Sequence, residues 1–487
     1  MDEKARSLLR AAVTGCAVLG LSVLLAACGR GLSDDLASDE GNIQAAWTEI
    51  GSGNQLLARV VTSHVPASAR EAVCPYMLVD GVARRMSLRV AAGTVAQRPT
   101  KSAPTDSKPS AFPVSVCEAP IPASAQSAFV AGRALPLAKA EPRRIAVIGD
   151  SGCRMKKSEN AWQACNDADA WPFAKVAAAA AAMNPDLVLH VGDYQYRENA
   201  CPPDVAGCQG SPWGYGWDTW RADLFTPAAP LLAKAPWIVV RGNHEECARA
   251  GQGWHRFLDT QPYSARRSCD AAANDEAANH ADPYAIALCA DTQVIVFDSA
   301  RAGNAALRPS DARWAAYQNQ LGAVAALAAR PAMTTTIFAS HHPVLAFDPV
   351  AGGAPKPGNQ ALQSVMQASH GAAYYPAGVT LALHGHVHGF QAISFASDHP
   401  ATIVAGNAGD RLDGALPDPL PAGATPAPGA IIERMSHHAS FGFLMMERPA
   451  GAAAWTFKAY TMAGKLLATC GQDGRKLLCD KAGFLTP

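Results

Sequence analysis

The sequence predicts an α/β domain that is preceded by a smaller β-sandwich, and two patterns support this prediction. Residues 41–137 contain short runs of alternating apolar and polar residues, such as "MSLRV" at 86–90, and polar, proline-rich stretches separate them. Period-two alternation without helical segments is typical of a β-sandwich. From "RRIAVIGD" at 143–150 onward, continuous apolar runs alternate with helical segments, which is typical of an α/β domain. We therefore assign residues 41–137 to the sandwich and residues 141–487 to the α/β domain.

The composition is that of a packed globular protein. The chain has 487 residues, of which 49% are hydrophobic and 17% are charged, and this length suffices for two or three domains. Lysine plus arginine and aspartate plus glutamate both number 41. Because these charges balance, we expect no broad basic surface that would bind a nucleic-acid backbone, and hence no nucleic-acid partner.

Residues 1–27 have the pattern of an export signal. Basic residues precede an apolar run at 11–27, as in secretory leaders. The run ends in "LAAC", which resembles a bacterial lipobox, so Cys28 is expected to receive lipid and to become the new N-terminus, with residues 28–40 as a tether. The alternative is an uncleaved anchor, for which the run is short, because a membrane span needs about 20 apolar residues. The expected product is an exported bacterial lipoprotein that faces the periplasm.

The cysteines predict disulfides, as expected in an oxidising compartment. Of the 13 cysteines, Cys16 lies in the leader and Cys28 at the lipid site, which leaves an odd number. Cys289 lies in an apolar segment and is the expected free, buried thiol. Zinc binding is the alternative use of cysteine, but the sequence has no CxxC pair. The expected disulfides are Cys74–Cys117, Cys153–Cys165, Cys201–Cys208 and Cys470–Cys479.

Short, continuous apolar runs predict the strands of the α/β domain. These runs lie at 145–148, 186–191, 237–240, 294–297, 334–338 and 379–383. Helices are predicted at 171–183 and at 310–329, where "PSD" supplies capping residues at the N-terminal end.

Polar clusters stand where apolar strands end. They are "GDSG" (149–152), "GDYQY" (192–196), "GNHE" (242–245), "SHHP" (340–343) and "HGHVH" (384–388). In open α/β sheets, ligands bind beyond the carboxyl ends of strands, so these loops are expected to converge on one site. Carboxylate, imidazole and amide ligands suit iron, zinc or manganese, and two neighbouring metals suit phosphoryl displacement.

The order GD, GDxxY, GNHE, HxP and GHxH resembles that of the calcineurin-like metallophosphoesterases, and within them the purple acid phosphatases. Most of the superfamily has a metal-binding histidine two residues after the first aspartate, whereas this chain has Gly152. The second motif has Tyr196 where other branches commonly have aspartate. The resemblance covers about residues 144–409. It implies a four-layer αββα sandwich, and the β-sandwich before it resembles the fibronectin III-like, non-catalytic domain of larger members.

The same resemblance implies a ligand set and a proton donor. Iron(III) would be bound by Asp150, Tyr196 and His388, and Asp193 would bridge to a second, divalent metal that is iron, zinc or manganese. The second metal would also bind Asn243, His341 and His386. His244 would protonate the leaving alcohol, and Glu245 is near enough in sequence to orient it.

The expected activity is hydrolysis of small phosphate monoesters. Arg197, Arg249 and His342 are candidates for substrate binding because they stand close to ligand positions in the sequence. For both arginines, a structural salt bridge or a solvated side chain is the alternative. A phosphodiesterase or nucleotide hydrolase on the same metals is the alternative enzyme. A non-catalytic lipoprotein that binds an envelope component is the alternative from another class.

Overall fold

The structure is a computed structural model that describes residues 40–66, 72–452 and 454–487. The expected leader, the lipid site at Cys28 and all but the last residue of the expected tether lie outside the described residues. Within the part of the chain that is described, no helix has the length and apolar composition that crossing a membrane requires.

Two large sheets form the centre of the molecule. The first contains, in spatial order, β28 (Lys476–Cys479), β27 (Leu466–Asp473), β26 (Thr456–Thr461), β25 (Gly442–Glu447), β11 (Arg144–Ile148), β14 (Leu187–His190), β15 (Trp237–Val239), β1 (Ile43–Ile50), β2 (Leu56–Thr62), β8 (Ser115–Ile121) and β5 (Ser87–Val90). The second contains β16 (Tyr284–Cys289), β17 (Thr292–Val296), β18 (Thr335–Ala339), β21 (Leu381–His384), β23 (Ala401–Ala405), β22 (Phe390–Phe395), β24 (Ile432–His438) and β29 (Gly483–Phe484).

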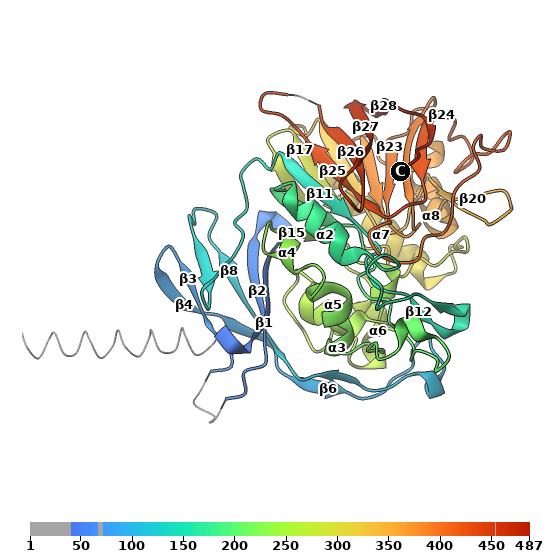
Figure 1. The fold of residues 1–487 in the computed structure, drawn as a ribbon. Helices are drawn as coiled ribbons and strands as arrows, with labels where there is room; N and C mark the ends of the chain where they lie inside the picture. The colour runs from blue at the N-terminus through green and yellow to red at the C-terminus, as the bar shows by residue number, and fades with distance from the viewer. Residues whose placement is uncertain (1–39, 67–71, 453) are drawn as a thin grey trace, which may run out of the picture.

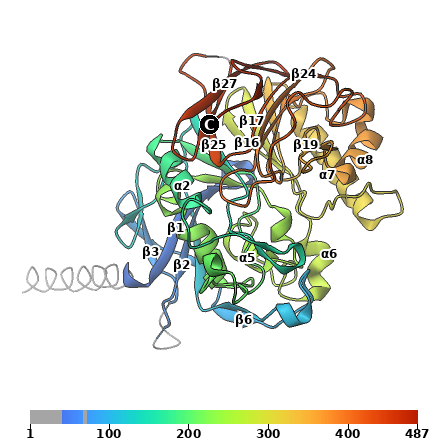
Figure 2. The ribbon, with the colours of Figure 1, turned by 45° about the vertical axis from the view of Figure 1, so that its right-hand side comes forward.

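The two sheets pack face to face, and helices cover their outer faces. Alternate residues of β11 point to opposite sides, so that Ile145 joins the core between the sheets while Ile148 packs toward α2 (Phe173–Ala182). The outer face of the second sheet is covered by α7 (Ala312–Ala328) and α8 (Gln360–His370). Figures 1 and 2 show α2 on one side of the sheets and α8 on the other. The predicted four-layer α/β fold is confirmed, and the predicted strands and both helices are present.

Shorter helices lie in the connections between β14 and β16. They are α3 (Trp217–Trp220), α4 (Ala229–Leu232), α5 (Gly251–Phe257) and α6 (Asp275–Ala278). Of these, α5 follows the "GNHE" cluster closely, and its position therefore bears on the site.

The N-terminal region is rich in strands, as predicted. A third sheet, in the order β10 (Arg133–Ala134), β9 (Ala128–Val130), β3 (Tyr76–Val79) and β4 (Val82–Arg85), packs on β2 and β8 through Met77 and Val130. The Cys74–Cys117 disulfide joins the two layers. In addition, β1 pairs in parallel with β15 at Glu49 and Trp237. The first large sheet is therefore continuous across the predicted domain boundary.

Two buried arginines fix the N-terminal strands to α5. Arg59 donates to the carbonyl oxygens of Phe257 and Asp259, each at 2.6 Å. Arg89 donates to the carbonyl oxygens of His255 and Asp259, each at 2.8 Å. The last carbonyls of a helix lack partners within the helix, so these contacts satisfy them and place positive charge at the negative end of the helix dipole.

The predicted disulfides are all present. A further one, Cys247–Cys269, closes the segment after the "GNHE" cluster. Cys289 is the free cysteine of the described residues, as predicted, but it is half-buried and not fully buried. Its Sγ lies 3.1 Å from Arg448 Nη1 at the edge of the second sheet.

Candidate metal centre

The polar clusters converge where parallel strands of both sheets end. β11, β14 and β15 run parallel in the first sheet, and β18 and β21 run parallel in the second. Three residues of these clusters have left-handed backbones, with φ of 56° at Asp150, 59° at Asp193 and 68° at His386. Such conformations are costly outside glycine and occur preferentially at functional sites.

Tyr196 lies at the centre of one group of predicted ligands. Its hydroxyl oxygen is 2.9 Å from Asp150 Oδ1, 2.8 Å from Asp193 Oδ2 and 3.1 Å from His388 Nε2. All four side chains are buried.

A second group shares Asp193 with the first. His341 Nε2 lies 3.1 Å from Asp193 Oδ2 and 3.1 Å from Asn243 Oδ1. His386 Nδ1 lies 3.0 Å from Asn243 Oδ1 and 3.3 Å from His341 Nε2. His341 Nε2 and His386 Nδ1 thus lie beside the same amide oxygen of Asn243, and His341 Nε2 also lies beside the Asp193 carboxylate.

The donor atoms fit two metal ions. Ligand bonds of about 2.0–2.2 Å place neighbouring donors of one ion roughly 3 Å apart, which is the spacing found in both groups.

The charges around the two groups also favour cations. Burial lowers the pKa of His341, but the charges of Asp193 and Asp150 outweigh burial and raise this pKa to about 9. Likewise, burial opposes protonation of His388, but Asp413, Asp410 and Asp150 raise its pKa to about 10.

The backbone of Tyr196 occupies the space that a side chain at position 152 would need. A Cβ on Gly152 would lie 2.8 Å from the backbone nitrogen of Tyr196, 2.9 Å from the carbonyl oxygen of Tyr194 and 2.8 Å from Asp223 Oδ2. Such separations are shorter than van der Waals contact. This backbone therefore leaves no room for any side chain at position 152, including a histidine.

His244 is held beside the predicted metal ligands by Glu198 and not by Glu245. Its Nδ1 lies 3.0 Å from Glu198 Oε1, and its ring packs on the Tyr196 ring with centroids 3.8 Å apart. The expectation that Glu245 orients His244 is wrong. The Glu245 carboxylate instead accepts hydrogen bonds from backbone N–H groups, at 3.1 Å from Asp193 and 2.9 Å from Tyr194. Glu245 thereby fixes the loop that bears Asp193.

The candidate substrate-binding residues divide into two kinds. Arg197 Nε lies 2.5 Å from Asp223 Oδ1, and its guanidinium packs over Trp171, so it makes a buried salt bridge outside the cavity. Successive side chains of an extended segment point in opposite directions, and Tyr196 points at Asp150, Asp193 and His388. Arg249 and His342 do line the cavity at the centre. Arg249 pairs with Glu198, and the His342 ring packs on His386 at 4.3 Å.

The cavity over the ligands has a volume of about 490 Å³. This volume lies within the roughly 300–1,000 Å³ of small-molecule sites. Its wall includes residues that sequence analysis did not find, namely Arg154, which packs over Tyr196 at 4.8 Å, and Lys101 from the N-terminal region. Glu198 was also missed, although it stands five residues after Asp193 in the same motif region.

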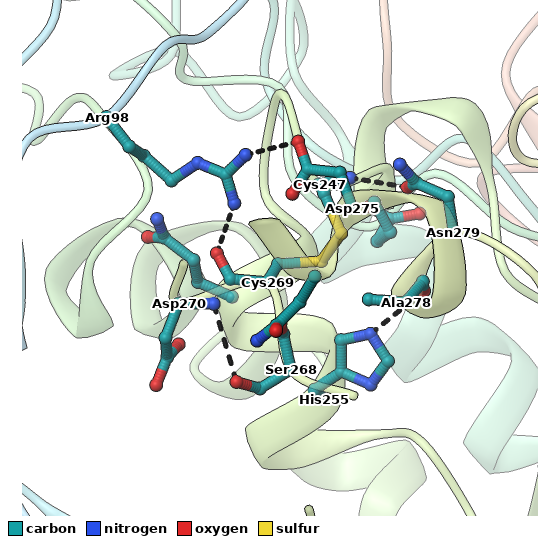
Figure 3. Close-up of a disulfide and its surroundings, with 12 residues drawn as sticks. Arg98, Cys247, His255, Ser268, Cys269, Asp270, Asp275, Ala278 and Asn279 are labelled. Carbon is teal, nitrogen blue, oxygen red and sulfur yellow. Dashed lines mark hydrogen bonds and ion pairs between the residues drawn. A yellow bond between two sulfur atoms is a disulfide. The ribbon is translucent and has the colours of Figure 1, made fainter. Parts of the chain in front are cut away.

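A second group with ligand spacing, Cys247, His255 and Cys269, does not form a metal site in this structure. Its two cysteines are joined as a disulfide, as Figure 3 shows. The Asp193, His341 and His386 group retains free donor atoms.

Comparisons with known proteins identify the family and the fold of the chain. A family model of calcineurin-like phosphoesterases matches residues 143–390, just over half of the chain. The purple acid phosphatase PPD1 from yellow lupin (Lupinus luteus) seeds is similar with a TM-score of 0.51 and 13% identity, over 87% of this chain and 73% of that chain. A structure of PhoD is similar with a TM-score of 0.51 and 10% identity, over 90% of this chain and 92% of that chain. No curated protein matches the chain.

At such low identities, the two solved structures show a shared fold, while the family model shows membership. The family typically uses two metal ions, and the two donor groups that share Asp193 fit that number. The chain therefore belongs to the calcineurin-like phosphoesterase family of hydrolases that act on phosphoric esters.

Proposed function

We propose that the protein hydrolyses phosphate monoesters at a centre of one iron(III) and one divalent metal. The observation that supports this most is the position of Asp193 Oδ2, which lies 2.8 Å from the Tyr196 hydroxyl and 3.1 Å from His341 Nε2. One carboxylate oxygen thus belongs to both donor groups, as is expected of a residue that bridges two metals. Asp150, Tyr196 and His388 would complete the iron site, and Asn243, His341 and His386 the site of divalent iron, zinc or manganese.

Tyr196 favours iron(III) over a divalent ion at the first position. Burial, Asp150 and Asp193 raise the pKa of its phenol well above the ordinary value, so only a strong local positive charge can deprotonate it. A phenolate would then stabilise the oxidised iron and give the protein a visible colour. The purple acid phosphatase-like character of the site rests on this residue.

In this proposal, separate residues of the protein orient the proton donor, donate the proton and contact the phosphoryl group. Two metals, when bound, lower the pKa of a bound water and neutralise charge on the phosphoryl oxygens. Glu198 holds His244 Nδ1, which leaves Nε2 facing the centre at 3.9 Å from Asp193 Oδ2. From there His244 would pass a proton to the leaving alcohol. Arg249 and His342 would contact the phosphoryl group from the cavity wall.

Metal analysis and a panel of esters test this proposal. Soluble protein that starts after Cys28 should contain iron and a second metal, and it should hydrolyse phosphate monoesters faster than diesters. Chelation should abolish the activity, and restored metals should return it. Faster hydrolysis of diesters or nucleotides would replace the monoester assignment, and metal-free activity would contradict the proposal as a whole.

We also propose that the protein is exported and anchored by lipid on Cys28. Five disulfides in the described residues support export, because disulfides persist in oxidising compartments. Labelled lipid should be incorporated into the wild-type protein and not into Cys28→Ser. Equal incorporation into both would refute lipidation at this residue.

A further inference from the structure

A segment of the N-terminal region lies against the loops that form the metal centre. We name residues 93–112 the N-terminal arm. It begins with β6 (Gly93–Val95) and ends with β7 (Ser110–Phe112), which pair with one another. Figure 1 shows β6 below α3 and α6, away from the N-terminal sheets. The backbone N–H of Lys101 donates to the carbonyl of Ala248 at 2.9 Å, four residues after His244.

The arm is attached to the segment that the Cys247–Cys269 disulfide closes. Arg98 donates to the carbonyl oxygen of Cys269 and lies 2.5 Å from Asp275 Oδ2, as Figure 3 shows. On the other side of the centre, Asn199 Nδ2 donates to Ser102 Oγ and to the carbonyl of Asp106, each at 3.0 Å. Because the arm contacts Asn199, next to Glu198, and Ala248, next to Arg249, it has a fixed position at the cavity.

This position brings Lys101 into the cavity wall. Its ammonium group pairs with Glu246, which also lines the cavity, and 51% of its side chain is exposed. Its side chain is thus accessible at the cavity wall. A substrate group that reaches this point meets a cation that the N-terminal arm supplies.

Arg301 lies in the same part of the wall. Arg313 donates to the carbonyl oxygens of Arg301 and Ala302 at 3.4 and 3.0 Å. The pKa of Arg313 is raised chiefly by its hydrogen bonds to Asp311, and the charge of Glu246 adds to this effect. The charge of Glu246 therefore acts on both Lys101 and Arg313, and these residues line the same cavity as Arg301.

Within the described residues, Arg301 differs from most cations of the cavity in making no ion pair with a carboxylate, although its charge helps to lower the pKa of Asp311. The paired cations and their partners are Lys101 with Glu246, Arg154 with Asp410, Lys156 with Glu159, Arg249 with Glu198, and Arg313 with Asp311. Within the described residues, the guanidinium groups of Arg301 and Arg411 make no ion pair, although both line the cavity. Arg411 follows Asp410 on the side of His388.

We propose that Lys101 and Arg301 form a second anion-binding subsite, which selects phosphate esters whose alcohol part bears another anionic group. This inference rests on the proposed phosphomonoesterase function and adds the class of leaving group to it. The cavity of about 490 Å³ has room for an alcohol part beside the phosphoryl group. An anionic group bound here would pair with the Arg301 guanidinium, which makes no ion pair within the described residues. It would also compete with Glu246 for the Lys101 ammonium group.

Calorimetric titration with two phosphonates tests the subsite without any turnover. Phenylphosphonate and 4-carboxyphenylphosphonate differ only in one carboxylate. Full-length, metal-loaded protein should bind the carboxylated ligand about tenfold more tightly, the usual value of a hydrogen bond to a charged group. Lys101→Gln and Arg301→Gln should each lose most of that preference and keep the affinity for phenylphosphonate, while Lys101→Arg should retain the preference.

Lys108→Gln is the matched control, because Lys108 lies on the same arm but packs on Trp213 outside the cavity wall. It should retain the preference. Equal affinities of the wild type for both phosphonates would overturn the subsite. A preference that survives Lys101→Gln and Arg301→Gln but is lost in Arg411→Gln would also overturn it. The same holds if Lys101→Gln and Arg301→Gln weaken the binding of both phosphonates equally. A carboxylate preference without hydrolysis of phenyl phosphate would instead contradict the proposed function.

Discussion

Glu198 Oε1 and His244 Nδ1 lie 3.0 Å apart, on the side of the imidazole that faces away from the Asp193 carboxylate. Burial opposes ionisation of Glu198, but Arg249 and His244 outweigh it and hold the pKa of this carboxyl well below its ordinary range. An ionised carboxylate at this position keeps the proton on Nδ1 and stabilises the ring when it becomes charged, as in other carboxylate–histidine pairs. Nε2 is thus the nitrogen that would exchange a proton at the centre, although burial and the charge of Arg249 lower the pKa of His244 to about 3.

Glu198→Gln should therefore lower kcat by roughly 10²-fold, the lower end of what a positioned acid contributes. The amide retains the size of the carboxylate but cannot balance a charged imidazole. Both metals should remain bound, since Glu198 is not among the predicted ligands, and metal analysis of the variant checks this. A variant that loses one metal equivalent would show that Glu198 supports the centre itself.

Gly152→Ala should disturb the centre through packing alone. The added Cβ would approach the Tyr196 and Tyr194 backbones and Asp223 within 2.8–2.9 Å, and overpacking of this kind costs about 1–3 kcal/mol. Iron binding and the unfolding midpoint should both fall. Gly322→Ala in α7 is the control, because its Cβ would meet nothing within 4 Å and alanine favours helices. An unchanged iron content in Gly152→Ala would show that the backbone adapts.

Asp259→Asn should weaken the contact between α5 and its neighbours in a pH-dependent way. Burial alone would raise the pKa of Asp259, but the hydrogen bond from His255 and the charge of Arg267 lower it to about 2, from 3.8. A carboxyl group with a depressed folded-state pKa stabilises the fold above the unfolded-state value, and this stabilisation is lost as the pH falls from 3.8 toward 2.

The variant should therefore lose about 2 kcal/mol of unfolding free energy at pH 7. Denaturant titration of both proteins measures this difference, which should shrink as the pH falls below 4. A difference that is the same at pH 7 and at pH 3 would mean that the carboxylate charge of Asp259 does not contribute.

The convergence of the two donor groups was predictable because short motifs at or soon after the ends of strands contain their residues. Residues brought in by distant segments were not predictable. Lys101 reaches the cavity only because the arm lies on the loop at Ala248. The parallel pairing of β1 with β15 likewise joins Glu49 to Trp237 across the chain, and no local pattern specifies such a partner.

Side-chain direction was the other source of error. Proximity in sequence suggested that Glu245 orients His244, but the tight turn at Asn243–Glu245 directs its carboxylate back to the backbone N–H groups of Gly242 and Asp193. Arg197 follows a residue that points at the metal ligands, and it therefore points away from them, toward Asp223.

Tyr196→Phe tests the central claim, that the phenol of Tyr196 binds iron(III), most directly. The substitution keeps the ring and removes the oxygen that lies 2.8–3.1 Å from Asp150, Asp193 and His388. The measurement is the iron content and visible spectrum of both proteins after purification in air. We expect a coloured, iron-containing wild-type protein and a variant that has lost the colour and binds iron more weakly. A variant with unchanged iron, spectrum and rate would contradict the assignment of Tyr196 as a ligand.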